Sequence, residues 1–205
     1  STTFNTRPRK KSTTQSGVTT IENIKDTADA DTTKYGVYLQ DAITFDNNKS
    51  LELIAGIRYD KYDINAKNDE AYITTHDNIG VVNEPVNLDE YSINPSISLI
   101  YDLSPDLSAY GKYSTAFRAP AYSELNTAHG NRIASGYYFL SNPELQPETS
   151  NNYEVGLKGD FSKFDFSLVG FVSKYEDLID QTMSFDDDGL MVFKYTNAED
   201  AKIYG

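Results

Sequence analysis

The sequence predicts an all-β protein: an antiparallel transmembrane β-barrel, of which this chain forms one part. Three observations predict it. Apolar and polar residues alternate along long segments, short and long connections alternate between those segments, and tyrosine is abundant. Alternation places apolar side chains on one face of a sheet and polar side chains on the other. The 16 tyrosines and 10 phenylalanines suit the aromatic girdles of membrane barrels.

Seven segments have the length and the alternation of barrel strands. The clearest is Tyr91–Leu103, where Ile97 and Leu99 alternate with Ser96 and Ser98. The expected strands are Lys34–Phe45, Leu51–Asn65, Tyr91–Leu103, Leu107–Phe117, Asn152–Phe161, Phe164–Tyr175 and Met191–Gly205. Closed bacterial barrels have even strand numbers, and hydrocarbon does not tolerate open sheet edges. We therefore expect the chain to be a fragment of a larger barrel.

The connections between these strands differ in length in a regular way. Short turns are expected at Asp46–Lys49, Ser104–Asp106 and Ser162–Lys163, long ones at Ala66–Glu90 and Ala119–Ser150, and an intermediate one at Thr182–Gly189. Short periplasmic turns and longer extracellular loops alternate in outer-membrane barrels. A soluble β-sandwich, the alternative, has less reason to alternate its loops so regularly.

The first 33 residues differ in character from the rest, so we divide the chain into a polar extracellular segment, residues 1–33, and a partial barrel, residues 34–205. The segment is rich in Thr and Ser and holds the basic cluster Arg7–Lys11. Charge runs of this kind are usually solvated loops. The alternative is a cluster that meets anionic lipopolysaccharide or a partner protein.

Composition excludes several classes of protein. The formal net charge of -13 argues against nucleic acid as a partner, since phosphate binding needs a basic surface. Cysteine is absent, so there is no disulfide, thiolate metal site or cysteine nucleophile. No nucleophile elbow, phosphate loop or zinc-protease motif is present, so we do not expect an enzyme.

Two sequence blocks carry the functional signal. The first is Phe117-Arg118-Ala119-Pro120, at the end of one expected strand, and the second is Asn142-Pro143-Glu144-Leu145, which leads into another. They resemble the FRAP and NPxL signature of TonB-dependent outer-membrane receptors, in the haem and haemoglobin (haemoglobin/transferrin/lactoferrin-type) branch. Tyr35–Asp41 and Tyr153–Lys158 are similar to barrel strands of the same family.

The resemblance implies that the chain is a C-terminal part of a barrel of about twenty-two strands with a plugged lumen. It implies a location in the outer membrane of a Gram-negative bacterium, in contact with outer-membrane lipid. Haem would be a transported ligand rather than a permanent cofactor, taken from haemoglobin, another haemoprotein or a haemophore. The TonB energy-transducing complex would be a partner. A receptor for a ferric siderophore or another nutrient is the alternative, and a soluble β-rich adhesin a third hypothesis.

Haem receptors of this family usually have an iron-ligating histidine between the two blocks, and His129 occupies that interval. An imidazole is a good haem-iron ligand. Tyr137 and Tyr138 follow in the same loop, and a phenolate can ligate haem iron while a ring can stack on the porphyrin. His76, in the other long loop, is a weaker candidate contact. For each histidine the alternative is an ordinary loop position.

Two further groups have competing interpretations. Arg118 would pair with a haem propionate or a plug residue in one, and form a salt bridge in the barrel wall in the other, which we favour because the block occurs in receptors with unrelated ligands. Asp186–Asp188 could bind calcium through carboxylate oxygens, but the segment lacks the spacing of an EF-hand, so a polar turn is expected.

Overall fold

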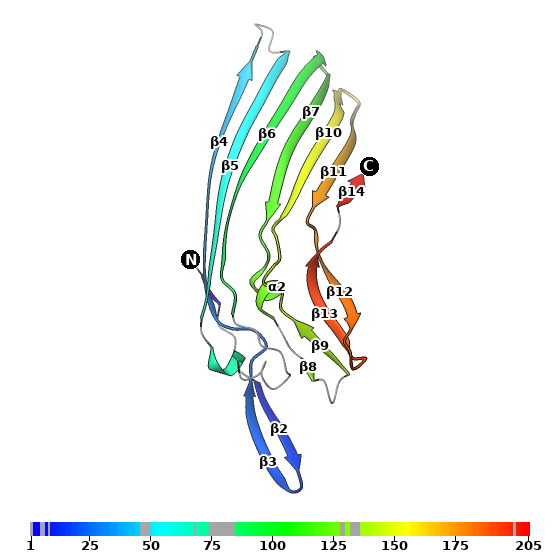
Figure 1. Cartoon of the computed structure of the whole chain (residues 1–205). Coiled ribbons are helices and arrows are strands. Elements are labelled where there is room, and N and C mark those ends of the chain that lie inside the picture. The colour runs from blue at the N-terminus through cyan, green and yellow to red at the C-terminus, as the bar shows by residue number, and fades with distance from the viewer. Residues whose placement is uncertain are drawn as a thin grey trace.

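The computed structural model describes residues 2–4, 7, 9–45, 50–67, 69–73, 85–127, 130–131, 136–198 and 200–205. Within these residues the main element is a tall, curved sheet of antiparallel strands, ordered β1-β4-β5-β6-β7-β10-β11-β14 (Figure 1). Their bounds are β1 Thr2–Phe4, β4 Ala30–Thr44, β5 Leu51–Ala66, β6 Leu88–Ser104, β7 Leu107–Arg118, β10 Glu148–Phe161, β11 Phe164–Glu176 and β14 Ala201–Tyr204. The sheet is open, because β1 and β14 each pair on one side within the described residues.

Six of the seven expected strands are confirmed, as β4, β5, β6, β7, β10 and β11. They extend up to four residues beyond the expected bounds, mainly at the end with the long connections. The short turns expected after β6 and after β10 are also confirmed, at Pro105–Asp106 and Ser162–Lys163. The turn expected at Asp46–Lys49 lies outside the described residues. Figure 1 shows the short connections at the top of the wall and the long ones at the bottom.

The wall has one apolar and one largely polar face, as the alternation predicts. On the apolar face large side chains stand exposed, among them Leu39 at 73%, Ile93 at 57% and Leu168 at 64%. The polar face carries pairs such as Arg58 and Asp60, whose Nη2 and Oδ1 atoms are 2.6 Å apart. A continuous exposed apolar surface of this size is typical of a membrane-facing wall.

Aromatic rings form two belts on the apolar face. Near the long connections the belt consists of Tyr35, Tyr59, Tyr91, Tyr113, Tyr153 and Tyr204, and near the short turns of Phe45, Tyr101, Phe161, Phe164 and Phe166. Rings within each belt touch: the Tyr113 and Tyr153 centroids are 5.1 Å apart, as are those of Phe161 and Phe164. From Tyr153 to Phe161 is about 26 Å of strand at ~3.3 Å per residue, or about 20 Å along the normal of a tilted barrel. The belts therefore bracket an apolar band of membrane dimensions.

Pro95 divides β6 into two parts. β5 pairs with β6 from Leu88 onward, whereas the pairing of β6 with β7 begins at Ser96. Proline has no amide hydrogen to donate to a ladder, so it marks the place where two strands separate. Beyond it β7 pairs only with β10 within the described residues, up to the partners Arg118 and Glu148.

The last expected strand, Met191–Gly205, is wrong as a single element. It is divided into β13 Met191–Asn197 and β14, and β13 leaves the wall to join a second sheet, ordered β12-β13-β9-β8. The other members are β12 Ile179–Phe185, β9 Tyr137–Leu140 and β8 Gly130–Asn131. Asp177, with a left-handed φ of 57°, turns the chain between β11 and β12. The expected connection Thr182–Gly189 is thus half strand.

The N-terminal segment contains strands that the sequence analysis did not predict. β2 Arg9–Gln15 and β3 Val18–Ile24 form a hairpin that projects from the long-connection end (Figure 1). Ser16 and Gly17 form its turn with φ of 52° and 81°, as a type I′ turn requires. β4 begins at Ala30, before the expected boundary at residue 33, and the division of the chain there stays a prediction.

No helix in the described part of the chain combines the length and apolar character needed to cross a bilayer. The helical elements are short: α2 Tyr122–Asn126 and a turn at residues 70–73. Both lie at the long-connection end, where the buried apolar side chains gather.

Candidate functional site

A small hydrophobic core closes the long-connection end of the wall. Its members come from three strands and from the connection between β7 and β10: Ala30, Ile64, Leu88, Ala119, Tyr122, Leu125 and Leu145. Phe117 packs against this core, its ring centroid 5.9 Å from that of Tyr62. Pro120 is fully buried. Both sequence blocks therefore contribute to one core, although more than twenty residues separate them.

Arg118 joins three segments by ion pairs. Its Nε and Nη2 atoms donate to Oε2 and Oε1 of Glu148 at 2.6 and 2.7 Å, which links β7 to β10. Its Nη1 atom donates to both carboxylate oxygens of Glu124 in α2 at 3.1 Å. Glu148 also accepts the amide of Ile179 at the start of β12, at 2.7 Å. Arg118 thus forms the wall salt bridge that the sequence analysis favoured.

Asn142 and Asn197 anchor the second sheet to the connection that follows the second block. The Asn142 side chain donates to the Tyr195 carbonyl at 2.8 Å and accepts the Glu144 amide at 3.2 Å. Asn197 accepts the Gln146 amide at 2.8 Å and donates to the Gln146 carbonyl at 2.9 Å. Leu145 is buried, whereas Pro143 and Glu144 are exposed. In the second block, Asn142 and Leu145 therefore provide the bracing.

A buried lysine ties the hairpin segment to the connection between β5 and β6. The Lys25 Nζ atom pairs with Asp29 Oδ1 at 2.8 Å and also with Asp69, and the residue is 5% exposed. Burial lowers the pKa of Lys25, but the hydrogen bonds to Asp29 and Asp69 outweigh it and raise the pKa overall. Tyr72, three residues after Asp69, is fully buried, and burial raises its pKa to about 12.

Asn126 holds the connection before β6 by pairing with a backbone. Its Oδ1 atom accepts the Val86 amide at 2.6 Å and its Nδ2 atom donates to the Val86 carbonyl at 3.0 Å. Asn126 is fully buried, so the two bonds satisfy a side chain that would otherwise be costly there. The connections at this end are therefore braced to one another as well as to the wall.

The structure separates the two candidate tyrosines, since neighbouring residues of β9 face opposite ways. Tyr138 is 6% exposed and its hydroxyl donates to Asp186 Oδ2 at 3.1 Å. Tyr137 is half-buried and lies edge-on to Phe193, at 6.0 Å and 85°. Phe139 stacks on Phe193 at 4.9 Å and 19°, so Tyr137 belongs to a group of aromatic rings on one face of the second sheet.

That ring-bearing face extends over β12 and β13. Met183 and Phe193 are register partners, as are Phe185 and Met191. Phe185 is 64% exposed and Met183 53%. This face was not predicted from the sequence, although Gln181, Met183 and Phe185 alternate along β12 and so share one face.

Both candidate histidines, His129 and His76, lie outside the described residues. The residue that follows His129 in the chain is described: Gly130 is the register partner of Tyr138. Gly130 has φ 139°, and a Cβ atom there would lie 2.6 Å from Tyr138 Cα. Glycine is therefore required where β8 meets β9.

Asp186–Asp188 forms a polar turn, as expected. Asp186 Oδ1 accepts the amides of Asp188 and Leu190 at 3.0 and 2.9 Å, and its Oδ2 atom accepts the Tyr138 hydroxyl. Within the described residues, no group of three His, Asp or Glu side chains is arranged to hold a metal ion. The described residues at this end thus offer aromatic contacts, hydrogen bonds and ion pairs, while His129 stays the first sequence candidate for an iron ligand, ahead of Tyr137 and Tyr138.

Comparison with known proteins agrees with this architecture. Residues 2–205 match the family model described as TonB dependent receptor-like, beta-barrel. Over 151 residues the chain is 33% identical to "Hemoglobin-haptoglobin utilization protein B" of Neisseria meningitidis, a match that covers 71% of this chain and 17% of that protein. It is 28% identical to the "Hemin receptor" of Yersinia pestis over 82% of this chain and 24% of that protein.

A solved structure has the same wall. A double mutant of the haemophore receptor HasR of Serratia marcescens, in complex with its haemophore HasA and haem, superposes with a TM-score of 0.65 over 91% of this chain and 33% of that chain. At 19% identity this likeness shows the fold alone. The chain spans about a quarter or less of the two curated relatives. Because the family model matches nearly the whole of this chain, the chain belongs to the TonB-dependent receptor-like β-barrel family.

Proposed function

We propose that this chain is part of an outer-membrane receptor of a Gram-negative bacterium that imports haem, taken from haemoglobin or another haemoprotein or haemophore. The observation that carries the proposal is the match of 151 residues to a protein named for the use of haemoglobin–haptoglobin. The apolar face and its two aromatic belts support a place in the membrane. Import would draw energy from the TonB complex. Haem is the cargo, not a resident cofactor.

We assign cargo contact to the connection between the two sequence blocks. His129 is our candidate for the iron ligand, since a neutral imidazole nitrogen binds haem iron well. Tyr137 is our candidate for contact with the porphyrin face, because its ring lies on the aromatic face of the second sheet. Tyr138 is the weaker of the two tyrosines, since its hydroxyl is engaged by Asp186. His76 remains a secondary candidate.

The braced end of the wall would hold this contact in place. Arg118 and Asn142 fix the two ends of the connection to β10 and β13, so a ligand-bearing segment between them would be presented from a rigid base. Functional groups carried on loops above a rigid scaffold are the usual arrangement for binding sites.

An absorbance titration of haemin into the whole detergent-solubilised receptor tests the proposal. Wild type is compared with His129→Ala, the variant of the first candidate, and with His76→Ala, the variant of the secondary candidate. A Soret shift that is present in wild type and His76→Ala but lost in His129→Ala is the expected result. A shift retained in every variant would keep haem as cargo and remove His129 as its ligand.

The absence of any shift in wild type, with or without haemoglobin as donor, would overturn haem as the cargo. A ferric siderophore or another nutrient would then take its place, with Tyr137 and Phe139 among its contacts. A receptor that folds without detergent would instead favour the soluble adhesin of the third hypothesis.

A further inference from the structure

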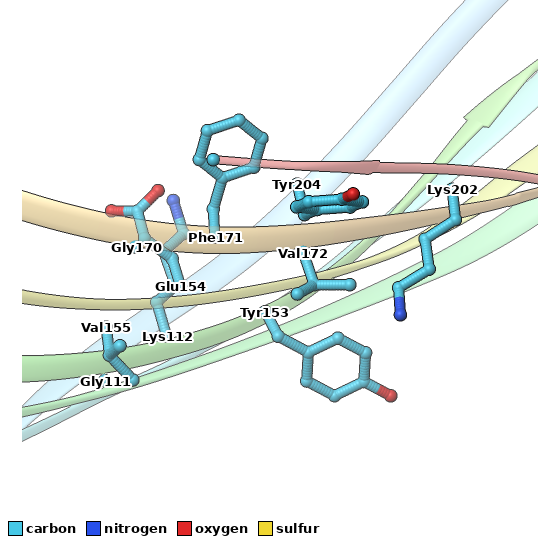
Figure 2. A pocket seen from close by; sticks show the side chains of 11 residues that line it. Gly111, Lys112, Tyr153, Glu154, Val155, Gly170, Phe171, Val172, Lys202 and Tyr204 are labelled. Carbon is cyan, nitrogen blue, oxygen red and sulfur yellow. The ribbon is translucent and has the colours of Figure 1, made fainter.

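A hollow of about 810 Å³ lies along β7, β10, β11 and β14, near the belt at the long-connection end. Three residues in one row across the sheet form its floor: Val155 is the register partner of Gly111 on β7 and of Gly170 on β11. Figure 2 shows it from close by. Tyr153, Val172, Lys202 and Tyr204 line it from the apolar face, and the hollow also touches residues that alternate with these along the strands, namely Lys112, Glu154, Phe171 and Gly205.

The two glycines of the floor differ from other glycines of the wall. A side chain at Gly36 would meet Arg58 and Asp60, and a side chain at Gly156 would meet the ring of Tyr110. At Gly111 nothing lies within 4 Å of an added Cβ, and at Gly170 the nearest atoms are 3.9 Å away. Glycine in a strand costs stability, and at these two positions no described neighbour requires it. The missing side chains leave an unfilled space on the apolar face.

The rim of the hollow toward the long connections is basic. Lys174 and Lys202 are register partners one row beyond Val172 and Tyr204. The Lys202 Nζ atom lies 6.0 Å from the centroid of the Tyr204 ring, and Figure 2 shows Lys202 on the same side of the sheet as Tyr153. Within the described residues, no salt bridge engages either lysine. Lysines beside an aromatic belt typically reach for the charged surface of a membrane.

We propose that this hollow is a binding site for an outer-leaflet lipid that carries phosphate, namely the lipid A portion of lipopolysaccharide. One acyl chain lies over Gly111, Val155 and Gly170, and a phosphate is bound by Lys174 and Lys202. The long connections mark the outer side of such barrels, which places the basic rim at the level of outer-leaflet phosphates. The site requires the membrane location proposed above, but it does not depend on which cargo is imported.

The test is native mass spectrometry of the whole receptor, titrated in detergent with diphosphorylated, hexa-acylated lipid A. Gly111→Leu with Gly170→Leu fills the hollow, and Lys174→Gln with Lys202→Gln removes the cations. Ala55→Leu, on the same face away from the hollow, and Lys158→Gln, on the other face, are the matched controls. We expect each double variant to retain lipid A about tenfold less well or worse, and the controls to match wild type.

Equal retention in all variants would overturn the proposal. So would equal retention of phosphatidylethanolamine, which has no net charge. A concentration-dependent dimer that the leucine pair abolishes would assign the hollow to a second copy of the chain instead. Heat-dependent mobility on gels checks that each variant folds, and the glutamine pair tests the site even where the leucine pair does not fold. Haemin titration of the same variants keeps failure of this site distinct from failure of the haem proposal.

Discussion

The Arg118 guanidinium forms a bidentate ion pair with the Glu148 carboxylate, with Nε–Oε2 and Nη2–Oε1 distances of 2.6 and 2.7 Å. The two residues are register partners at the ends of β7 and β10, and the connection that holds the ligand candidates runs between them. Glu148 is mostly buried and also accepts the Ile179 amide, so one ion pair fixes the base of that connection and the start of β12 together. Bidentate pairs between arginine and a carboxylate have strong hydrogen bonds and a fixed relative orientation of the two groups.

Replacing Arg118 by Ala should loosen both elements. We expect the local free energy of opening to fall by about 1–3 kcal/mol, because Glu148 keeps its charge in a mostly buried place. Hydrogen exchange at the Ile179 amide measures the effect. Arg58→Ala is the control, since Arg58 pairs with Asp60 in its own strand and half of its side chain is exposed. Unchanged exchange at Ile179 would show that Arg118 does not support β12.

Replacing Asn197 should lower the local stability of the second sheet. Its side chain accepts the Gln146 amide and donates to the carbonyls of Gln146 and Asp177, with distances of 2.7–2.9 Å. Asn197→Ala removes all three bonds, and we expect protection of the second sheet to fall by about 1–3 kcal/mol. Hydrogen exchange across β12 and β13 reads this out. Asn65→Ala, which loses only a bond to Asp63 in the same strand, should leave those amides unchanged.

Elements fixed by interactions between residues close in sequence could be predicted from the sequence, and elements fixed by interactions between distant residues could not. The strands of the wall could be predicted because alternation is local and the apolar face is continuous, as in β6. The break between β13 and β14 could not, since it depends on Asn197 meeting Gln146, which is distant in sequence. The hairpin turn at Ser16–Gly17 carried a readable signal, but the Thr-rich strands beside it resemble a polar loop.

The candidate site shows the same division. The two blocks could be identified by their residues, but their physical role could not. Whether Arg118 meets a ligand or Glu148 depends on the pairing of β7 with β10 across a long connection. The opposite orientations of Tyr137 and Tyr138 could be expected only once β9 was known to be a strand, because a loop does not fix side-chain direction.

The two tyrosines should therefore respond differently to substitution in the haemin titration. Tyr138→Phe keeps the ring and removes the hydroxyl that donates to Asp186, so we expect haemin affinity to stay at the wild-type value. Tyr137→Ala removes a ring from the aromatic face, and we expect affinity about two- to tenfold weaker. Phe139→Leu, which changes a neighbour of Tyr137 on that face, is a further variant for comparison. The reverse order of effects would move cargo contact to the other face of the second sheet.

Alkaline pH should weaken the long-connection end through Tyr72. Burial raises its pKa to about 12, against a smaller lowering by a hydrogen bond with Ser141. The folded pKa exceeds the unfolded value near 10, so the stabilisation is fully present below pH 10 and is lost as pH rises toward 12. About 2–3 kcal/mol would be lost across this window. The pH dependence of stability is measured by hydrogen exchange, corrected for the effect of pH on exchange itself, or by protease sensitivity. Tyr72→Phe should not show the loss of stability between pH 10 and 12 that wild type shows. Identical pH profiles would remove Tyr72 as the cause.

Glycines of the wall should fall into two classes under alanine substitution. Gly156 lies beneath the Tyr110 ring, whose hydroxyl donates to Glu154 Oε1 at 2.7 Å, so Gly156→Ala must displace the ring from this bond. We expect a loss of about 1–3 kcal/mol. Gly111→Ala meets no atom and should be neutral or stabilise by up to about 1 kcal/mol, because alanine restricts the unfolded chain. The temperature at which the receptor loses its folded mobility on gels measures both. Equal temperatures would show that the Tyr110 ring moves aside at little cost, so that its contact with Glu154 contributes little to the wall.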